Sequence, residues 1–259
     1  MPTLDVEGTR LRYEIQGSEG APWLVFSNSL GTNLSMWDGQ VAAFENEFRI
    51  LRYDARGHGG SDAPDGPYTI DRLGQDTLAL MDALGVERAG FCGLSMGGMV
   101  GMWLGTKAPE RLDRLVLANT AAHMPPADLW DGRIRTVTEK GMDALTEQVI
   151  ERWFSPDFRA SHRDRIAPVR EMLLATPRQG YAACCAAIRD MDQREIIRSV
   201  HTPTLVIAGA HDPATPPDKA EEIVGAIPGA ELVVLEAAHL SNIEAEAEFT
   251  GALRRFLQR

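Results

Sequence analysis

The 259-residue sequence predicts an α/β protein whose mostly parallel, twisted sheet is covered by helices on both faces. Two observations support this fold class. Short buried-strand patterns alternate with amphipathic helix patterns in both terminal parts of the chain, and the stretch between them carries helical patterns alone. We therefore expect a first part of the core at 1–122, a helical cap at 123–190 and a second part of the core at 191–259.

Composition limits the possible partners. The formal net charge of −11 and the pI of about 5.0 argue against nucleic acids and anionic membranes, because both attract basic surfaces. No apolar run reaches the length of a membrane span, and the start at 1–7 lacks the basic-then-apolar form of a signal peptide. Cys92, Cys184 and Cys185 do not suggest a disulfide framework. We expect a cytoplasmic protein.

The first part of the core begins with a predicted antiparallel hairpin around Glu7-Gly8. Apolar residues from 70 to 84 recur at helical spacing, which predicts a helix with one face on the sheet. Further helices are expected at 37–46 and from about 97. The strands are expected at 3–6, 11–16, 22–27, 48–53, 88–92 and 114–118.

The cap and the second part of the core follow. Prolines punctuate the cap, which shows no convincing strand pattern, and we expect it to lie over the sheet edge. Its helical patterns lie at 129–138, 142–153, 166–174 and 181–188. After the cap, strands are expected at 204–208 and 231–235, and helices at 218–226 and 244–257.

Gly93-Leu-Ser95-Met-Gly97 matches the G-x-S-x-G pattern of a nucleophile elbow. It stands where a buried strand turns into a helix. The glycines fit because the serine takes a strained backbone conformation and neighbouring chains approach closely. The pattern predicts a Ser95 hydroxyl at a helix N-terminus, where developing negative charge is favoured.

Two further residues complete a predicted catalytic triad. Ligands of parallel sheets gather at the carboxyl ends of the strands. Asp212 follows the strand at 204–208, and His239 follows the strand at 231–235. The order serine, aspartate, histidine is that of α/β-hydrolases, in which the histidine takes the hydroxyl proton and the aspartate orients the imidazole. The other histidines, among them His58 and His211, are interpreted as structural or surface residues.

An oxyanion hole needs two backbone N–H groups. Met96, directly after the nucleophile, supplies one, and Leu30 in the segment after the third strand is the candidate for the other. The glycine-rich stretch 54–61 lacks the features of a phosphate loop and is interpreted as a structural turn. No metal-ligand spacing occurs in the sequence, so we expect neither metal nor cofactor.

The chain resembles the 3-oxoadipate enol-lactonases of the α/β-hydrolase superfamily over essentially its whole length. The stretches that carry the resemblance are Phe26-Ser-Asn-Ser-Leu-Gly-Thr32, Leu51-Arg-Tyr-Asp-Ala-Arg-Gly-His-Gly-Gly-Ser61, Cys92-Gly-Leu-Ser-Met-Gly-Gly-Met-Val100, Asn119-Thr-Ala-Ala122 and Tyr181-Ala-Ala-Cys-Cys-Ala-Ala-Ile-Arg-Asp190. The first and last stretches are the more specific. In the first, Ser-Asn-Ser-Leu-Gly replaces the His-Gly that is common in the superfamily, and the last contains the Cys-Cys-Ala-Ala-Ile-Arg-Asp segment of the cap.

The resemblance implies hydrolysis of a small anionic enol-lactone to 3-oxoadipate through an acyl-enzyme on Ser95. The free carboxylate of such a substrate needs a cation in this acidic protein. Arg133 in the cap is the candidate, with Trp130 as an apolar wall. Arg189 is the alternative, although its neighbour Asp190 favours a structural ion pair.

Other functions remain open at this point. A general carboxylesterase, a carbon–carbon bond hydrolase or a perhydrolase would use the same triad. From a different class, a ligand-binding protein derived from a hydrolase would keep the pocket with little turnover. The sequence leaves the oligomeric state and the preferred lactone isomer open.

Overall fold

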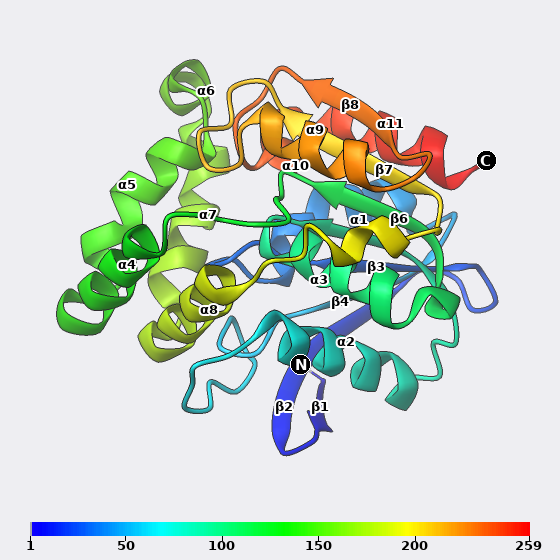
Figure 1. Ribbon diagram of the computed structural model, residues 1–259, viewed down its shortest axis with the longest axis horizontal. Coiled ribbons are helices and arrows are strands. Elements are labelled where there is room, and N and C mark those ends of the chain that lie inside the picture. Colours follow the sequence, from blue (N-terminus) through cyan, green and yellow to red (C-terminus); the bar gives the residue numbers. More distant parts are fainter. Residues whose placement is uncertain (1) are drawn as a thin grey trace.

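The strands of the computed structural model, which describes residues 2–259, form one sheet in the order β1-β2-β4-β3-β5-β6-β7-β8 (Figure 1). The β1–β2 and β2–β4 pairs are antiparallel, and all other pairs are parallel. The predicted α/β class is therefore confirmed. The strands are β1 (Thr3–Val6), β2 (Thr9–Gln16), β3 (Trp23–Ser27), β4 (Arg49–Tyr53), β5 (Ala89–Leu94), β6 (Leu112–Ala118), β7 (Thr204–Gly209) and β8 (Glu231–Leu235).

The centre of the sheet is the most deeply buried part. Every residue of β5 is buried, and β5 pairs with β3 on one side and β6 on the other. A parallel strand with both faces covered reads as a continuous small or apolar run, which Ala89–Leu94 is. The nucleophile elbow therefore follows a fully buried central strand.

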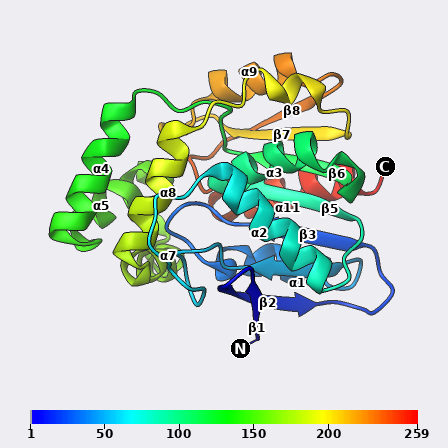
Figure 2. The same cartoon turned by 60° about the horizontal axis from the view of Figure 1, so that its bottom comes forward.

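Helices cover both faces of this sheet, as predicted (Figure 2). The helices α1 (Asp38–Phe44) and α11 (Glu246–Leu257) pack on one another on one face. The other face carries α2 (Ile70–Ala83), α3 (Met96–Lys107) and α9 (Pro217–Ala226). The N-cap residue Thr69 fixes the start of α2, because its hydroxyl accepts a hydrogen bond from the Arg72 N–H.

The insertion between β6 and β7 contains helices and loops but no strand within the described residues, and it lies beyond one end of the strands of the sheet (Figures 1 and 2). This is the carboxyl end, where the loops that carry Ser95 and His239 face the insertion across one cavity. Its helices are α4 (Ala127–Lys140), α5 (Asp143–Trp153), α6 (Pro156–Ser161), α7 (Arg163–Ala175) and α8 (Arg178–Asp190).

The cap touches the core closely at one pair of glycines. A Cβ on Gly180 of α8 would lie 2.3 Å from the backbone oxygen of Gly57, in the glycine-rich turn of the core. A second connection runs through Glu244, whose carboxylate accepts hydrogen bonds from the Ser155 N–H of the cap and from the Ala238 N–H next to His239. The cap is thus held against the loop of His239.

Three local features differ from the expectations. The helix α6 was not expected, since six residues are too few to show a period, although Ser155 caps it and Pro156 starts it. The helix expected at 244–257 begins at Glu246 as α11, and a separate short helix, α10 (Ser241–Glu244), precedes it. The helix expected at 37–46 begins with a 3-10 turn at Leu34–Trp37, capped by Asn33. In the part of the chain described, no helix has the length and apolarity to cross a membrane.

Candidate active site

Ser95 stands at the sharp turn between β5 and α3 with a positive φ of 57°. No residue other than glycine fits at the flanking positions 93 and 97. A Cβ on Gly93 would lie 2.0 Å from the Gly97 carbonyl oxygen, and one on Gly97 would lie 2.1 Å from the Ser27 carbonyl oxygen. The turn holds Ser95 in a conformation that costs about 1–3 kcal/mol in isolation, because the packed backbone around it permits no other.

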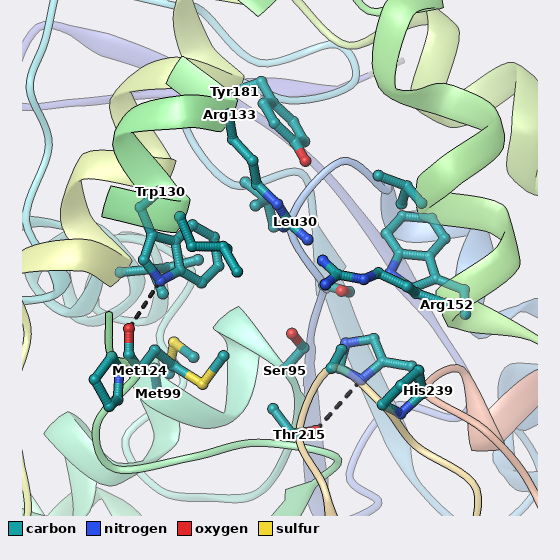
Figure 3. A pocket seen from close by; sticks show the side chains of 18 residues that line it. Leu30, Ser95, Met99, Met124, Trp130, Arg133, Arg152, Tyr181, Thr215 and His239 are labelled. Atoms are coloured by element: carbon teal, nitrogen blue, oxygen red, sulfur yellow. Dashed lines mark hydrogen bonds between the residues drawn. The ribbon is translucent and has the colours of Figure 1, made fainter. Parts of the chain in front are cut away.

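Asp212 and His239 form a buried pair beside Ser95. The Nδ1 atom of His239 lies 2.8 Å from Oδ2 of Asp212, and both side chains are almost fully buried. Figure 3 shows Ser95 and His239 facing the same cavity. Among the hydrogen bonds of residues 2–259 none joins Ser95 to His239, and such bonds commonly tighten only when substrate binds. The structure thus brings the three predicted triad residues together.

Asp212 is held as a carboxylate by five donors. Its Oδ1 accepts the N–H groups of Ala214 and Thr215, and its Oδ2 accepts His239 Nδ1, the Thr215 hydroxyl and the Asn119 amide. Burial alone would raise the pKa of Asp212. The attraction of His239 and the hydrogen bonds from His239 and Thr215 outweigh burial, so the pKa lies below its ordinary value.

Asn119 is a supporting residue that sequence reasoning missed. It follows β6 with a positive φ of 43°, a conformation that asparagine tolerates better than most residues. Its amide nitrogen lies 3.0 Å from Asp212 Oδ2 and 3.2 Å from the Ala238 carbonyl oxygen. The Ser241 hydroxyl donates to its Oδ1, which fixes the direction of the amide.

Two backbone N–H groups near Ser95 have no acceptor within the described part of the chain. They belong to Leu30 and Met96, the residues predicted to form the oxyanion hole. The next N–H along the chain, that of Gly31, donates to Nε2 of His58 at 2.8 Å. Asp54 accepts the Leu34 N–H at 2.7 Å. The glycine-rich turn therefore holds the segment that carries Leu30, a more specific role than the structural turn that was expected.

A small cavity of about 190 Å³ lies between this machinery and the cap. This volume lies below the range of about 300–1,000 Å³ that is usual for ligand pockets, so the cavity suits a small molecule. The predicted residues Arg133 and Trp130 both line it, with the Arg133 guanidinium 4.9 Å from the centre of the Trp130 ring. Arg152 of α5 and Tyr181 of α8 line it as well and were missed by the sequence analysis (Figure 3).

The two arginines make the cavity positive. Within residues 2–259, neither Arg133 nor Arg152 forms a salt bridge, whereas Arg189 pairs with Asp131 and Asp190. Burial lowers the pKa of Arg152, and the nearby charge of Arg133 lowers it further. Two cations held close without a carboxylate repel one another, so an anion between them would be stabilised. Arg189 does not line this cavity.

Among residues 2–259 no group of three or more histidine, cysteine, aspartate and glutamate side chains lies close enough to hold a metal ion. The cysteines of the described chain are free and buried.

Comparison with known proteins agrees with this geometry. The family model described as alpha/beta hydrolase fold matches residues 22–246. The chain is 40% identical to 3-oxoadipate enol-lactonase 2 of Acinetobacter baylyi over 257 residues, which cover 99% of this chain and 96% of that one.

Two solved structures are also similar. The enol-lactonase of Burkholderia xenovorans LB400 matches with a TM-score of 0.98 and 45% identity, covering 100% of both chains. A thermophilic esterase of Thermogutta terrifontis matches with a TM-score of 0.91 and 29% identity, covering 99% of this chain and 96% of that one. The chain therefore belongs to the α/β-hydrolase family and, within it, to the 3-oxoadipate enol-lactonases.

Proposed function

We propose that this protein hydrolyses 3-oxoadipate enol-lactone to 3-oxoadipate, with Ser95, His239 and Asp212 as its catalytic triad. The observation that carries the proposal is the small cavity that joins an elbow serine to two unpaired arginines. A substrate that fits this cavity would place an ester bond near the serine and a carboxylate near the arginines, which is the description of a small anionic ester. The similarity to enol-lactonases over the full length of the chain supports the same substrate.

The first half of the reaction is acylation. Nε2 of His239 accepts the Ser95 proton while Oγ attacks the lactone carbonyl carbon, and the carbonyl π electrons move onto its oxygen. The N–H groups of Leu30 and Met96 bind this oxyanion. When the carbonyl re-forms, the ring C–O bond breaks and its electron pair leaves with the enol oxygen. That oxygen takes a proton from His239, and the enol relaxes to the ketone.

The second half is deacylation. The leaving group stays attached to the acyl chain, so ring opening leaves a linear acyl-enzyme on Ser95. His239 then takes a proton from water, whose hydroxide attacks the acyl carbon. When the tetrahedral intermediate collapses, the bond between the acyl carbon and Ser95 Oγ breaks, Oγ takes a proton from His239, and the dicarboxylate product leaves. Asp212 stays ionised throughout and stabilises the histidine cation.

We propose Arg152 as a partner of Arg133 in binding the substrate carboxylate. The two come from different cap helices, α5 for Arg152 and α4 for Arg133, and both side chains extend into the cavity above Ser95 and His239 (Figure 3). Trp130 keeps one wall apolar, and its indole N–H is already satisfied by the Met124 carbonyl at 2.8 Å. The ring of the lactone can thus lie against Trp130 while its acetate arm meets the arginines.

This assignment supports a division of labour between the predicted parts of the chain. We propose that the core at 1–122 and 191–259 performs the chemistry and that the cap at 123–190 selects the substrate. The triad and both oxyanion donors belong to the core, and the arginines and Trp130 belong to the cap.

The test compares the lactone with a neutral ester, p-nitrophenyl acetate. Arg133→Gln and Arg152→Gln should each raise KM for the lactone about 10- to 100-fold, since a hydrogen bond to a charged group is worth roughly 1.5–3 kcal/mol. The ester lacks the carboxylate, so its KM should not rise. Arg189→Gln is the matched control, because this arginine lies outside the cavity in ion pairs. Equal effects on both substrates would contradict the assignment.

A further inference from the structure

Ser29 carries a hydroxyl group that the mechanism above does not use. The residue is 1% exposed, lines the catalytic cavity and directly precedes Leu30. Its Oγ is fully buried and has no hydrogen-bond partner in the described part of the chain, and no other residue with such an atom lines the cavity. Buried hydroxyls in proteins are nearly always hydrogen-bonded, so an exception in an active site indicates a group kept for a ligand.

The surroundings of Ser29 show that the exception is local. The Ser27 hydroxyl lies 2.9 Å from the Tyr53 hydroxyl, and the Thr32 hydroxyl donates to the Ser29 carbonyl oxygen at 2.8 Å. The Thr32 N–H donates to the same carbonyl. Neighbouring hydroxyls are therefore satisfied, and the backbone of Ser29 is held in place while its side chain is left without a protein partner.

We propose that the Ser29 hydroxyl donates a hydrogen bond to the oxygen of the reacting carbonyl as it becomes an oxyanion. It would be the third donor beside the N–H groups of Leu30 and Met96. The inference deepens the proposed function, because it assumes acyl transfer at Ser95.

The position of Ser29 favours the carbonyl oxygen over the substrate carboxylate. Ser29 belongs to the core segment that presents the Leu30 N–H, whereas the arginines that receive the carboxylate come from the cap. A hydroxyl also differs from a backbone N–H in that it rotates. It can therefore follow the oxygen as the planar carbonyl becomes tetrahedral, which strengthens the bond in the transition state rather than in the ground state.

The test is Ser29→Ala, assayed with the lactone and with p-nitrophenyl acetate and followed by thermal unfolding. We expect kcat to fall roughly 10- to 100-fold for both substrates with little change in KM. The melting temperature should stay the same or rise, because the variant removes a buried hydroxyl that has no partner. A reversible trifluoromethyl ketone, which forms a tetrahedral adduct with the serine, should bind more weakly by a similar factor.

Ser27→Ala is the control for stability. It removes a hydroxyl that has a partner, so its melting temperature should fall. Ser29→Cys replaces the hydroxyl by a slightly larger group that is a weaker donor, and it should lose activity as the alanine variant does.

Three results would overturn the inference. They are unchanged kcat in Ser29→Ala, a rise in KM confined to the lactone, and a loss of activity that accompanies a loss of stability. If the wild-type protein hydrolysed the ester but not the lactone, the proposed substrate would be contradicted. The effect of Ser29→Ala on ester hydrolysis would still test the role of Ser29.

Discussion

Replacing Asp212 by asparagine tests how the buried hydrogen bonds fix the tautomer of His239. The new NH₂ group must take the place of one carboxylate oxygen. At Oδ1 it would oppose the N–H groups of Ala214 and Thr215, which cannot turn away. At Oδ2 it would oppose one fixed donor, the Asn119 amide, and would face two groups that can become acceptors. The Thr215 hydroxyl can rotate, and His239 Nδ1 can move its proton to Nε2. The second orientation is therefore favoured.

This orientation disables the base. With its proton on Nε2, His239 cannot accept the proton of Ser95, although the geometry of the site is unchanged. An asparagine in this role typically lowers kcat by about 10⁴, which corresponds to about 5 kcal/mol in the barrier. We expect that loss for the lactone and the neutral ester alike, measured as kcat at saturating substrate. A kcat within tenfold of wild type would refute the tautomer argument.

Two further predictions concern the core turn of 54–61. Burial lowers the pKa of His58 to about 4, so the residue is neutral in the fold and protonated when unfolded between about pH 4 and its ordinary 6.5. Stability should thus fall by about 3 kcal/mol as pH drops through this window, and urea unfolding of His58→Gln should lack that component; identical pH dependence in both proteins would rule the idea out. Gly180→Ala should cost about 1–3 kcal/mol in chemical denaturation, because its Cβ would lie 2.3 Å from the Gly57 oxygen. Gly132→Ala, with no atom within 4 Å of the new Cβ, should not be destabilised, and equal stability of the two variants would contradict the close contact.

Features that depend on local order along the chain could be predicted from the sequence. The elbow at Ser95 is recognisable in the sequence from its flanking glycines, because the neighbouring backbone leaves no room for a Cβ at those positions. Asp212 and His239 directly follow strands, and parallel strands bring their carboxyl ends to one side of the sheet. These inferences need only the strand positions, and the structure places the three residues together.

Features that depend on how the cap packs could not be predicted in the same way. Arg152 lies in an amphipathic pattern whose helix α5 was expected, but the pattern does not say that its end faces the cavity. Asn119 contacts Asp212 and Ala238, which are far from it in the sequence, and Ser29 matters because it lines the cavity. The periodicity of a sequence does not reveal such contacts. The short helix α6 could not be predicted for a different reason, because fewer than two helical turns show no hydrophobic period.

The most direct test of the central claim is the rate of 3-oxoadipate enol-lactone hydrolysis, followed by loss of ultraviolet absorbance beside p-nitrophenyl acetate. Wild-type protein and Ser95→Ala are compared at equal concentration. We predict a kcat/KM for the lactone far above that for the ester, with both activities abolished in the variant. Rapid turnover of the ester with an inert lactone would contradict the proposed substrate, and lactone turnover that survives in Ser95→Ala would contradict the nucleophile.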